Sequence, residues 1–264
     1  LQFLFAALQL PILLTYNDFQ YKVSYRPNQK NKISFIGLGA IDDFNLNSSV
    51  NDNITDLDVI ESNNFILGNI PIQKQWNYTV GVNWLHYSEH SYQNIVVSRN
   101  MLNNTSTRYK DLIEIPENLL LDYSSFEAEN KFRFEHTYNK NGWRINAGLG
   151  YEYARYYNST YNNITIQGQP MEINYESNLY LSKFALFGQV SKDYFNEKLI
   201  TSFGLRSDFS NYSSSLSNPL EQLSPSFSLS FRINEFWAIN ANLSRYHQLP
   251  SYTILGYRDG NDEL

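Results

Sequence analysis

Apolar and polar residues alternate with a period of two along most of this chain, most clearly over residues 143–153, WRINAGLGYEY. Successive side chains of a β-strand point to opposite faces, so such a segment predicts a strand with one apolar and one polar face. Eleven strands are predicted in this way, at residues 18–26, 31–41, 63–70, 76–87, 91–101, 124–137, 143–155, 179–191, 199–209, 223–233 and 237–246. The fold is therefore expected to be all-β and antiparallel.

Strands with one apolar face suit two architectures: a sandwich with a shared core, or a barrel that is apolar outside and wet inside. Several predicted strands have ten or more residues, which is enough to cross a bilayer when tilted. Short links (PNQK after Arg26, NKNG before Trp143) contrast with long polar links at 42–62, 102–123, 156–178 and 210–222. Outer-membrane barrels have short periplasmic turns and long extracellular loops. Strand length and link length together favour a transmembrane barrel.

The direction of the predicted strands is inconsistent between residues 42 and 123. The short turns at 27–30 and 192–198 should both lie at the periplasmic end, which requires an even number of strands between them, but seven are predicted there. Either a strand is missing from one of the two long links in this region, or residues 88–90 are not a hairpin turn.

Three arginines lie on the polar faces of strong predicted strands: Arg144, Arg206 and Arg232. Serines occupy most of the polar face of 223–233, and such a face is compatible with water. We expect the three arginines to line a lumen or to contact a domain inside it. Four tyrosines in the predicted long links, Tyr156, Tyr157, Tyr161 and Tyr212, could stack on a sugar or a siderophore, or could simply pack the loops together.

Composition narrows the class of protein. The 264 residues are 42% hydrophobic but contain no run of 18 apolar residues, which excludes a membrane-spanning helix. Aromatic residues reach 16%, which suits membrane interfaces. The net charge of −6 argues against a nucleic-acid partner, and the absence of cysteine excludes thiolate catalysis and cysteine–zinc sites.

Few sequence motifs point to catalysis, cofactor binding or metal binding. His86 and His90 have the HxxxH spacing of a metal site, but they lie at a predicted strand end and turn, where that spacing does not converge. No phosphate-binding loop, dinucleotide fingerprint or nucleophile motif is present. We therefore expect no enzyme activity, no cofactor and no metal site.

Three stretches carry a family resemblance. Residues 10–44 form an early hairpin with an Asp before the first strand, and 184–209 end in Gly-Leu-Arg-Ser-Asp. Residues 223–252 run from Ser-Pro through a turn to Tyr246, Gln248 and Pro250. These features resemble TonB-dependent outer-membrane receptors, particularly those of Bacteroidetes.

The resemblance implies a role in nutrient uptake across the outer membrane of a Gram-negative bacterium. Such receptors have about 22 strands, an N-terminal plug and a TonB-contacting box. Residues 1–264 would then be a partial β-barrel, about half of the whole, with the plug and the C-terminal strands absent. The implied partners are outer-membrane lipid, a TonB-type energy-coupling protein that acts through the plug, and a small nutrient ligand such as a ferric siderophore. A small free-standing porin and a soluble glycan-binding sandwich remain as alternatives.

Overall fold

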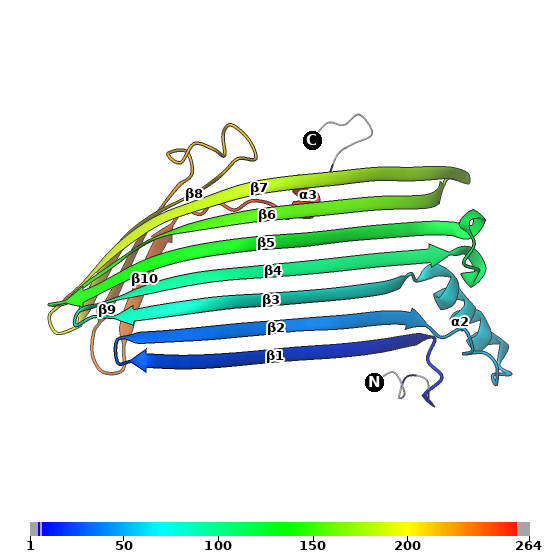
Figure 1. The fold of residues 1–264 in the computed structure, drawn as a ribbon, viewed down its shortest axis with the longest axis horizontal. Helices are drawn as coiled ribbons and strands as arrows, with labels where there is room; N and C mark the ends of the chain where they lie inside the picture. The colour runs from blue at the N-terminus through cyan, green and yellow to red at the C-terminus, as the bar shows by residue number, and fades with distance from the viewer. Residues whose placement is uncertain (1–4, 6, 258–264) are drawn as a thin grey trace.

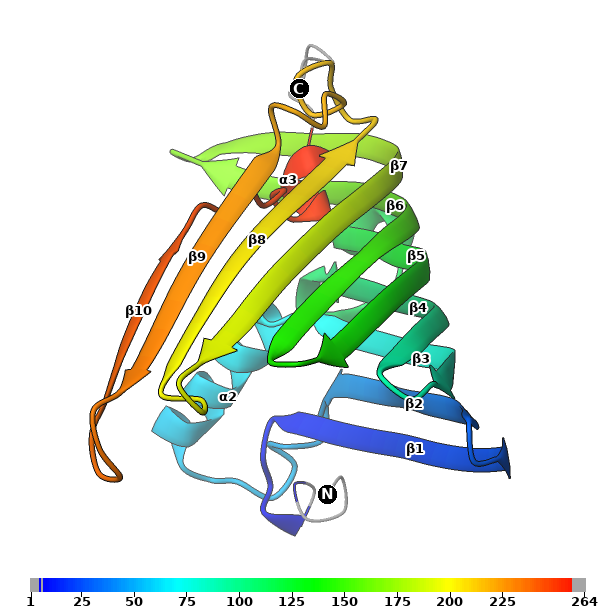
Figure 2. The same ribbon diagram turned by 90° about the vertical axis from the view of Figure 1, so that its left-hand side faces the viewer.

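The computed structural model of this protein describes Phe5 and residues 7–257, and residues 258–264 lie outside the described part. Within it, ten antiparallel strands form one sheet in which neighbours in sequence pair, with β1 and β10 at its edges. The strands are β1 (Ile12–Asn28), β2 (Asn31–Leu46), β3 (Ile72–Tyr87), β4 (Ser91–Tyr109), β5 (Leu119–Lys140), β6 (Trp143–Ile166), β7 (Gln169–Tyr194), β8 (Leu199–Ser210), β9 (Leu223–Arg232) and β10 (Ala238–Ser244). The sheet is curved, so it has the shape of a partial barrel (Figures 1 and 2).

The two faces of the sheet differ in polarity. Large apolar side chains on the convex face, such as Phe203, Leu205 and Phe227, remain exposed. Their neighbours in the chain, for example Ser202 and Arg206, lie on the concave face. A sandwich would bury its apolar faces against a second sheet. The described chain forms a single sheet whose apolar face has no protein cover, so the sandwich alternative is wrong.

The strand predicted at residues 63–70 is wrong, because these residues lie largely in helix α2 (Leu57–Asn69). Asp56 caps this helix, because its side chain accepts hydrogen bonds from the backbone N–H groups of Asp58 and Val59. A short apolar run such as Phe65-Ile66-Leu67 has no period that separates a strand from a helix. The cap upstream of the run was the informative signal.

The long links predicted at 102–123 and 156–178 are also largely wrong. β4 continues to Tyr109, β5 begins at Leu119, and only residues 167–168 separate β6 from β7. Two short helices, η1 (Lys110–Leu112) and η2 (Pro116–Asn118), occupy the first of these links. Water on both sides of a strand removes the need for an apolar face, so period-two alternation disappears although the hydrogen-bonded ladder continues. The link at 210–222 is confirmed, between the end of β8 and the start of β9.

Once residues 63–70 are assigned to helix α2 and not to a strand, the directions of the strands are consistent along the whole sheet. The turns after β1, β3, β5, β7 and β9 all lie at one end of the sheet, which we call the short-turn end (Figure 1). The turn after β5 is Asn141-Gly142, and both residues have the positive φ that a type I′ hairpin requires. The opposite end, the long-link end, holds α2, η1, η2 and residues 211–222. Among the described residues, none of the helices has both the length and the apolar character needed to cross a bilayer.

Candidate functional site

The concave face holds a cleft of about 1050 Å³. Strands β5 to β9 form its floor, and residues 246–249 of the segment after β10 form part of its rim. Because successive residues alternate between faces, each strand contributes every second side chain to the cleft. These side chains are mostly polar or charged, including Lys131, Arg133, Glu152, Lys183, Gln189 and Arg206.

A row of opposite charges crosses three strands at the cleft. In the sheet register, Lys131 of β5 lies opposite Glu152 of β6, which lies opposite Lys183 of β7. Lys131 Nζ is 2.6 Å from Glu129 Oε2 and 3.4 Å from Glu152 Oε2. Lys183 Nζ pairs with Glu152 and lies 3.6 Å from Glu129 Oε1. Directly opposite charges on one face stabilise the pairing of the strands that carry them.

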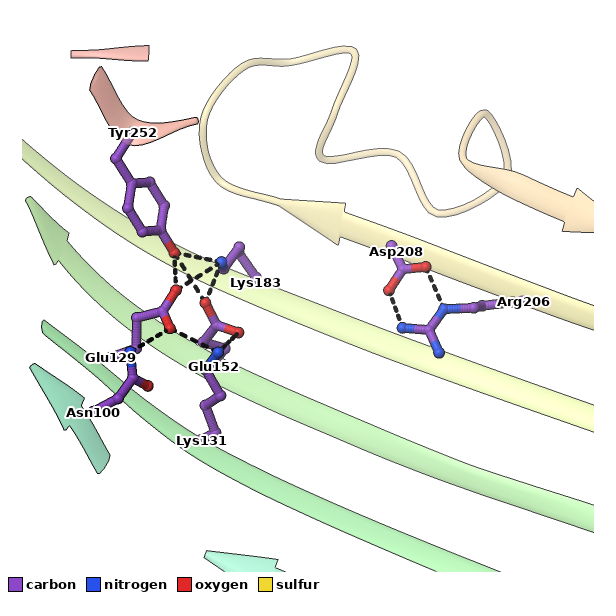
Figure 3. A network of polar contacts seen from close by, with 8 residues as sticks. All are labelled: Asn100, Glu129, Lys131, Glu152, Lys183, Arg206, Asp208 and Tyr252. Carbon is purple, nitrogen blue, oxygen red and sulfur yellow. Dashed lines mark hydrogen bonds and ion pairs between the residues drawn. The ribbon is translucent and has the colours of Figure 1, made fainter. Parts of the chain in front are cut away.

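Tyr252 of the short helix α3 (Tyr252–Leu255) completes this charge cluster, which comprises Glu129, Lys131, Glu152, Lys183 and Tyr252 (Figure 3). The Tyr252 hydroxyl accepts a hydrogen bond from Lys183 Nζ at 2.5 Å. It donates to Glu129 and lies 3.0 Å from Glu152 Oε1. Burial raises the pKa of Tyr252 above its ordinary value, and the hydrogen bond to Glu129 raises this pKa further. The phenol therefore stays protonated and remains a donor to the carboxylates.

The cluster has two carboxylates and two ammonium groups, so it is neutral overall. The side chains of Glu129, Glu152 and Lys183 are 13%, 20% and 25% exposed. Removal of one partner would leave the others with an uncompensated charge in a partly dry site, which is more costly than loss of an exposed ion pair. The geometry thus makes the cluster a structural attachment between α3 and the wall.

Apolar packing reinforces this attachment. Tyr252 and Leu255 join Ala154, Tyr156 and Leu181 in a small buried cluster on the concave side of β6 and β7. The Tyr252 ring lies 6.4 Å from the Tyr156 ring. Figure 2 shows α3 inside the curve of the sheet. The segment after β10 is therefore held in the interior and narrows the cleft at its long-link end.

A second charged group lies farther along the cleft. Arg206 donates to Asp208 from Nε at 2.5 Å and from Nη2 at 2.6 Å (Figure 3). The guanidinium of Arg206 is 5.8 Å from the centre of the Phe187 ring, and that of Arg133 is 5.6 Å from the same ring. Two arginines thus flank one aromatic ring on a water-accessible wall.

The three arginines predicted from the sequence all lie on the concave face, as expected from their strand positions. Only Arg206 lines the cleft. Arg144 donates from Nε to Asn139 Oδ1 at 3.1 Å, near the short-turn end. Arg232 is the last residue of β9, at the same end. The structure does not bring the three together into one site, and a contact with a plug stays a prediction.

Three of the four tyrosines predicted in loops lie on a strand instead. Tyr156, Tyr157 and Tyr161 lie on β6, so their assignment to a loop is wrong. Tyr156 is buried beneath α3, whereas Tyr157 points to the convex side and stacks on Phe126 with ring centres 5.6 Å apart. Only Tyr212 lies in a link as predicted, and its hydroxyl donates to the backbone carbonyl of Leu255 at 3.1 Å.

The charge cluster was not predicted from the sequence, although part of its pattern is present there. Charges of both signs alternate with other residues over 127–135, but the strand register is needed to align Lys131 with Glu152 and Lys183. No local pattern pointed to Tyr252, because its partners are more than 60 residues away. The two histidines of the HxxxH spacing do not converge: His86 contacts Asn31, and His90 lies 3.6 Å from Glu89. No described group of three or more metal-binding side chains could hold a metal ion.

Comparison with known proteins gives one family and several solved structures. The family model described as "TonB dependent receptor-like, beta-barrel" matches residues 11–264. No curated protein matches the chain. Similar structures include the FpvAI–pyocin S2 complex (10% identity, TM-score 0.67, 96% of this chain and 38% of that chain). The copper transporter OprC is also similar (11% identity, TM-score 0.64, 92% of this chain and 38% of that chain). So is a mutant ferric enterobactin receptor from Pseudomonas aeruginosa (17% identity, TM-score 0.63, 90% of this chain and 34% of that chain). At these identities the structures show a shared fold, and the chain spans little more than a third of their length.

Proposed function

The chain belongs to the family of TonB dependent receptor-like β-barrels, and from this premise we propose that it forms part of the wall of an outer-membrane receptor for a small nutrient ligand, of the ferric siderophore class. The observation that carries the proposal is the division of one curved sheet into an apolar convex face and a charged concave face with a cleft. Such a division suits lipid on one side and water on the other.

The proposal assigns a side of the membrane to each end of the sheet. The short-turn end would face the periplasm and the long-link end the outside of a Gram-negative cell, as in other outer-membrane barrels. Residues 211–222 and the segment around α3 would then lie near the entrance, where a ligand first arrives. Tyr212 is the predicted loop aromatic that keeps such a position.

A plug domain and the remaining strands of the barrel would come from other parts of the full receptor. In the proposal the plug closes the barrel, and Arg144, Arg206 and Arg232 are its candidate contacts because they lie on the concave face. A TonB-type partner would act on the plug from the periplasm. The charge cluster would keep the α3 segment against the wall, so that the cleft stays open beside it.

The full receptor that contains this chain provides the test. It should be recovered in the outer-membrane fraction of its source cells, and the isolated periplasmic domain of a TonB protein should bind it. Recovery in the inner membrane or in a soluble fraction would contradict the proposed role.

The ligand class needs a separate measurement. We expect cells with the receptor to accumulate radioactive iron presented as ferric enterobactin, and a protonophore to abolish the accumulation. Cells that lack the receptor are the control. Accumulation unchanged by loss of the receptor would rule out this siderophore and leave the outer-membrane assignment to the fractionation result.

A further inference from the structure

The convex face has an apolar band whose height can be estimated on β6. Its convex side chains from Trp143 to Tyr153 are apolar or aromatic: Ile145, Ala147, Leu149 and Tyr151 lie between them. Ten residues at about 3.3 Å each, tilted by about 40°, span about 25 Å, which is the height of the apolar band of an outer-membrane barrel. The next convex residue of β6 toward the long-link end is Arg155.

A second arginine lies at the same boundary. Arg99 is a convex residue of β4, and the register aligns it with Asn130 of β5 and Tyr153 of β6. Toward the short-turn end the next convex residue of β4 is Val97. Arg99 and Arg155 therefore lie two strands apart, close to the long-link boundary that β6 defines; on β4 the convex face continues past Arg99 with Met101 and then Asn103. Both are exposed.

Neither arginine has an acidic partner within ion-pair distance among the residues that the structure describes. Arg99 donates from Nε to the Tyr78 hydroxyl at 2.9 Å and from Nη1 to Asn130 Oδ1 at 2.8 Å, and both acceptors are neutral. The guanidinium of Arg155 lies 4.9 Å from the Phe126 ring centre and 5.3 Å from that of Tyr180. Each guanidinium is thus held in place while its charge remains uncompensated.

An apolar groove of about 460 Å³ runs from Arg99 into the band. It is lined mainly by Tyr21, Phe35, Val80, Val82, Val97 and Phe132. Gly37 shapes one side of the groove, because a Cβ there would collide with the Tyr21 ring that lies over it. From Arg99 the groove extends toward the short-turn end, into the apolar band. Its lining suits hydrocarbon.

We propose that Arg99, Arg155 and this groove form a binding site for a membrane lipid with a phosphate-bearing headgroup. The phosphate would lie on the arginines, and an acyl chain would lie in the groove. Arginine binds phosphate with paired, charge-assisted hydrogen bonds, and these are strong near the edge of the low-dielectric band. An arginine within a lipid-facing surface is costly unless its charge is compensated. The anionic headgroup supplies the missing partner.

The site is separate from nutrient uptake, because it lies on the convex face and its occupation involves no ligand in the cleft. The matched control is Lys192, a convex cation at the short-turn end. Its ammonium donates to the carbonyl of Asn141 at 2.6 Å and lies 5.3 Å from the Trp143 ring centre. Lys192 has the same sign of charge and an aromatic neighbour, but it pairs with Trp143 at the opposite boundary of the apolar band from Arg99 and Arg155.

Native mass spectrometry of the full receptor in detergent tests the site, with dipalmitoyl phosphatidic acid as the probe. Dipalmitoylglycerol has the same chains without phosphate, and inorganic phosphate has no chains. We expect the unsubstituted receptor to retain phosphatidic acid in clear preference to both. Equal retention of dipalmitoylglycerol would overturn the proposal, as would equal binding of inorganic phosphate, which would indicate a free-phosphate site.

Substitutions then locate the binding. The double variant R99Q/R155Q should bind phosphatidic acid about tenfold more weakly or worse, since it loses hydrogen bonds to a charged group. K192Q should bind it as the unsubstituted receptor does. Unchanged binding by the double variant, or an equal loss in K192Q, would contradict the proposed location. The comparison of the three probes uses the unsubstituted protein, so it stands even where the double variant does not fold.

Discussion

At the scale of single residues, this chain places its strongest polar contacts in the interior and leaves its large apolar side chains exposed. Glu129 and Glu152 receive hydrogen bonds or ion pairs from Lys131, Lys183 and Tyr252. Exposed apolar residues such as Phe203 would be an aggregation hazard in water. They are ordinary on the outside of a membrane barrel, where lipid covers them.

The hydroxyl of Tyr252 gives a residue-scale prediction. Y252F removes the group that bridges Lys183 and the two carboxylates but keeps the ring in its apolar cluster. Hydrogen bonds to charged groups contribute about 1.5–3 kcal/mol. We therefore expect the backbone amides of Leu255 and Gly256 to exchange with solvent about tenfold faster or more.

Hydrogen exchange measured by mass spectrometry on the full receptor checks this expectation. Y161F is the control, because among the described residues the Tyr161 hydroxyl hydrogen-bonds only to Glu172, at 3.3 Å, away from α3. If Y252F and Y161F exchange alike around α3, the charge cluster does not hold this helix to the wall.

At the scale of elements, the sequence predicted the strands well where one face is apolar and the other polar. Strands β3, β6 and β8 were found within the membrane band for this reason. The same criterion failed beyond it: residues 156–166 of β6 are rich in Asn, Tyr and Thr and show no alternation. A ladder with water on both faces needs only backbone hydrogen bonds, which leave no pattern in the side chains.

The charge cluster could not be predicted from the sequence, for a related reason. Its members come from four elements, and their meeting depends on the register of β5, β6 and β7 and on the return of the chain after β10. A single sequence carries the polarity of each strand but not the alignment between strands. The concave arginines could be predicted because the face of a residue follows from its strand alone.

Helix α2 gives the prediction for this scale. D56A removes the carboxylate that caps the helix, and loss of such a cap costs about 1 kcal/mol. The amides of residues 60–67 should then exchange roughly fivefold faster. D52A, in the preceding link, removes a carboxylate that caps no helix. Equal exchange in D56A and D52A would show that the cap does not stabilise α2.

At the scale of the whole molecule, all five connections at one end of the sheet are short, whereas three of the four at the other end are long and only the β6–β7 turn there is short. This arrangement predicts the sidedness of the chain in the cell. A cysteine introduced as S214C, in the link at 211–222, should react with a membrane-impermeant maleimide added to intact cells. E89C, in the turn after β3, should react only after the outer membrane is permeabilised. The reverse order would invert the proposed orientation.

The central claim is that adjacent residues of one strand face lipid and water, and Phe203 and Ser202 of β8 test it most directly. Spin labels would be attached to F203C and S202C in the full receptor, reconstituted in phosphatidylglycerol vesicles. Power-saturation measurements compare collisions with oxygen, which concentrates in lipid, and with a water-soluble nickel chelate. We predict that the label at 203 collides mainly with oxygen and the label at 202 mainly with the chelate. Equal accessibility of both labels to the chelate would contradict a membrane wall.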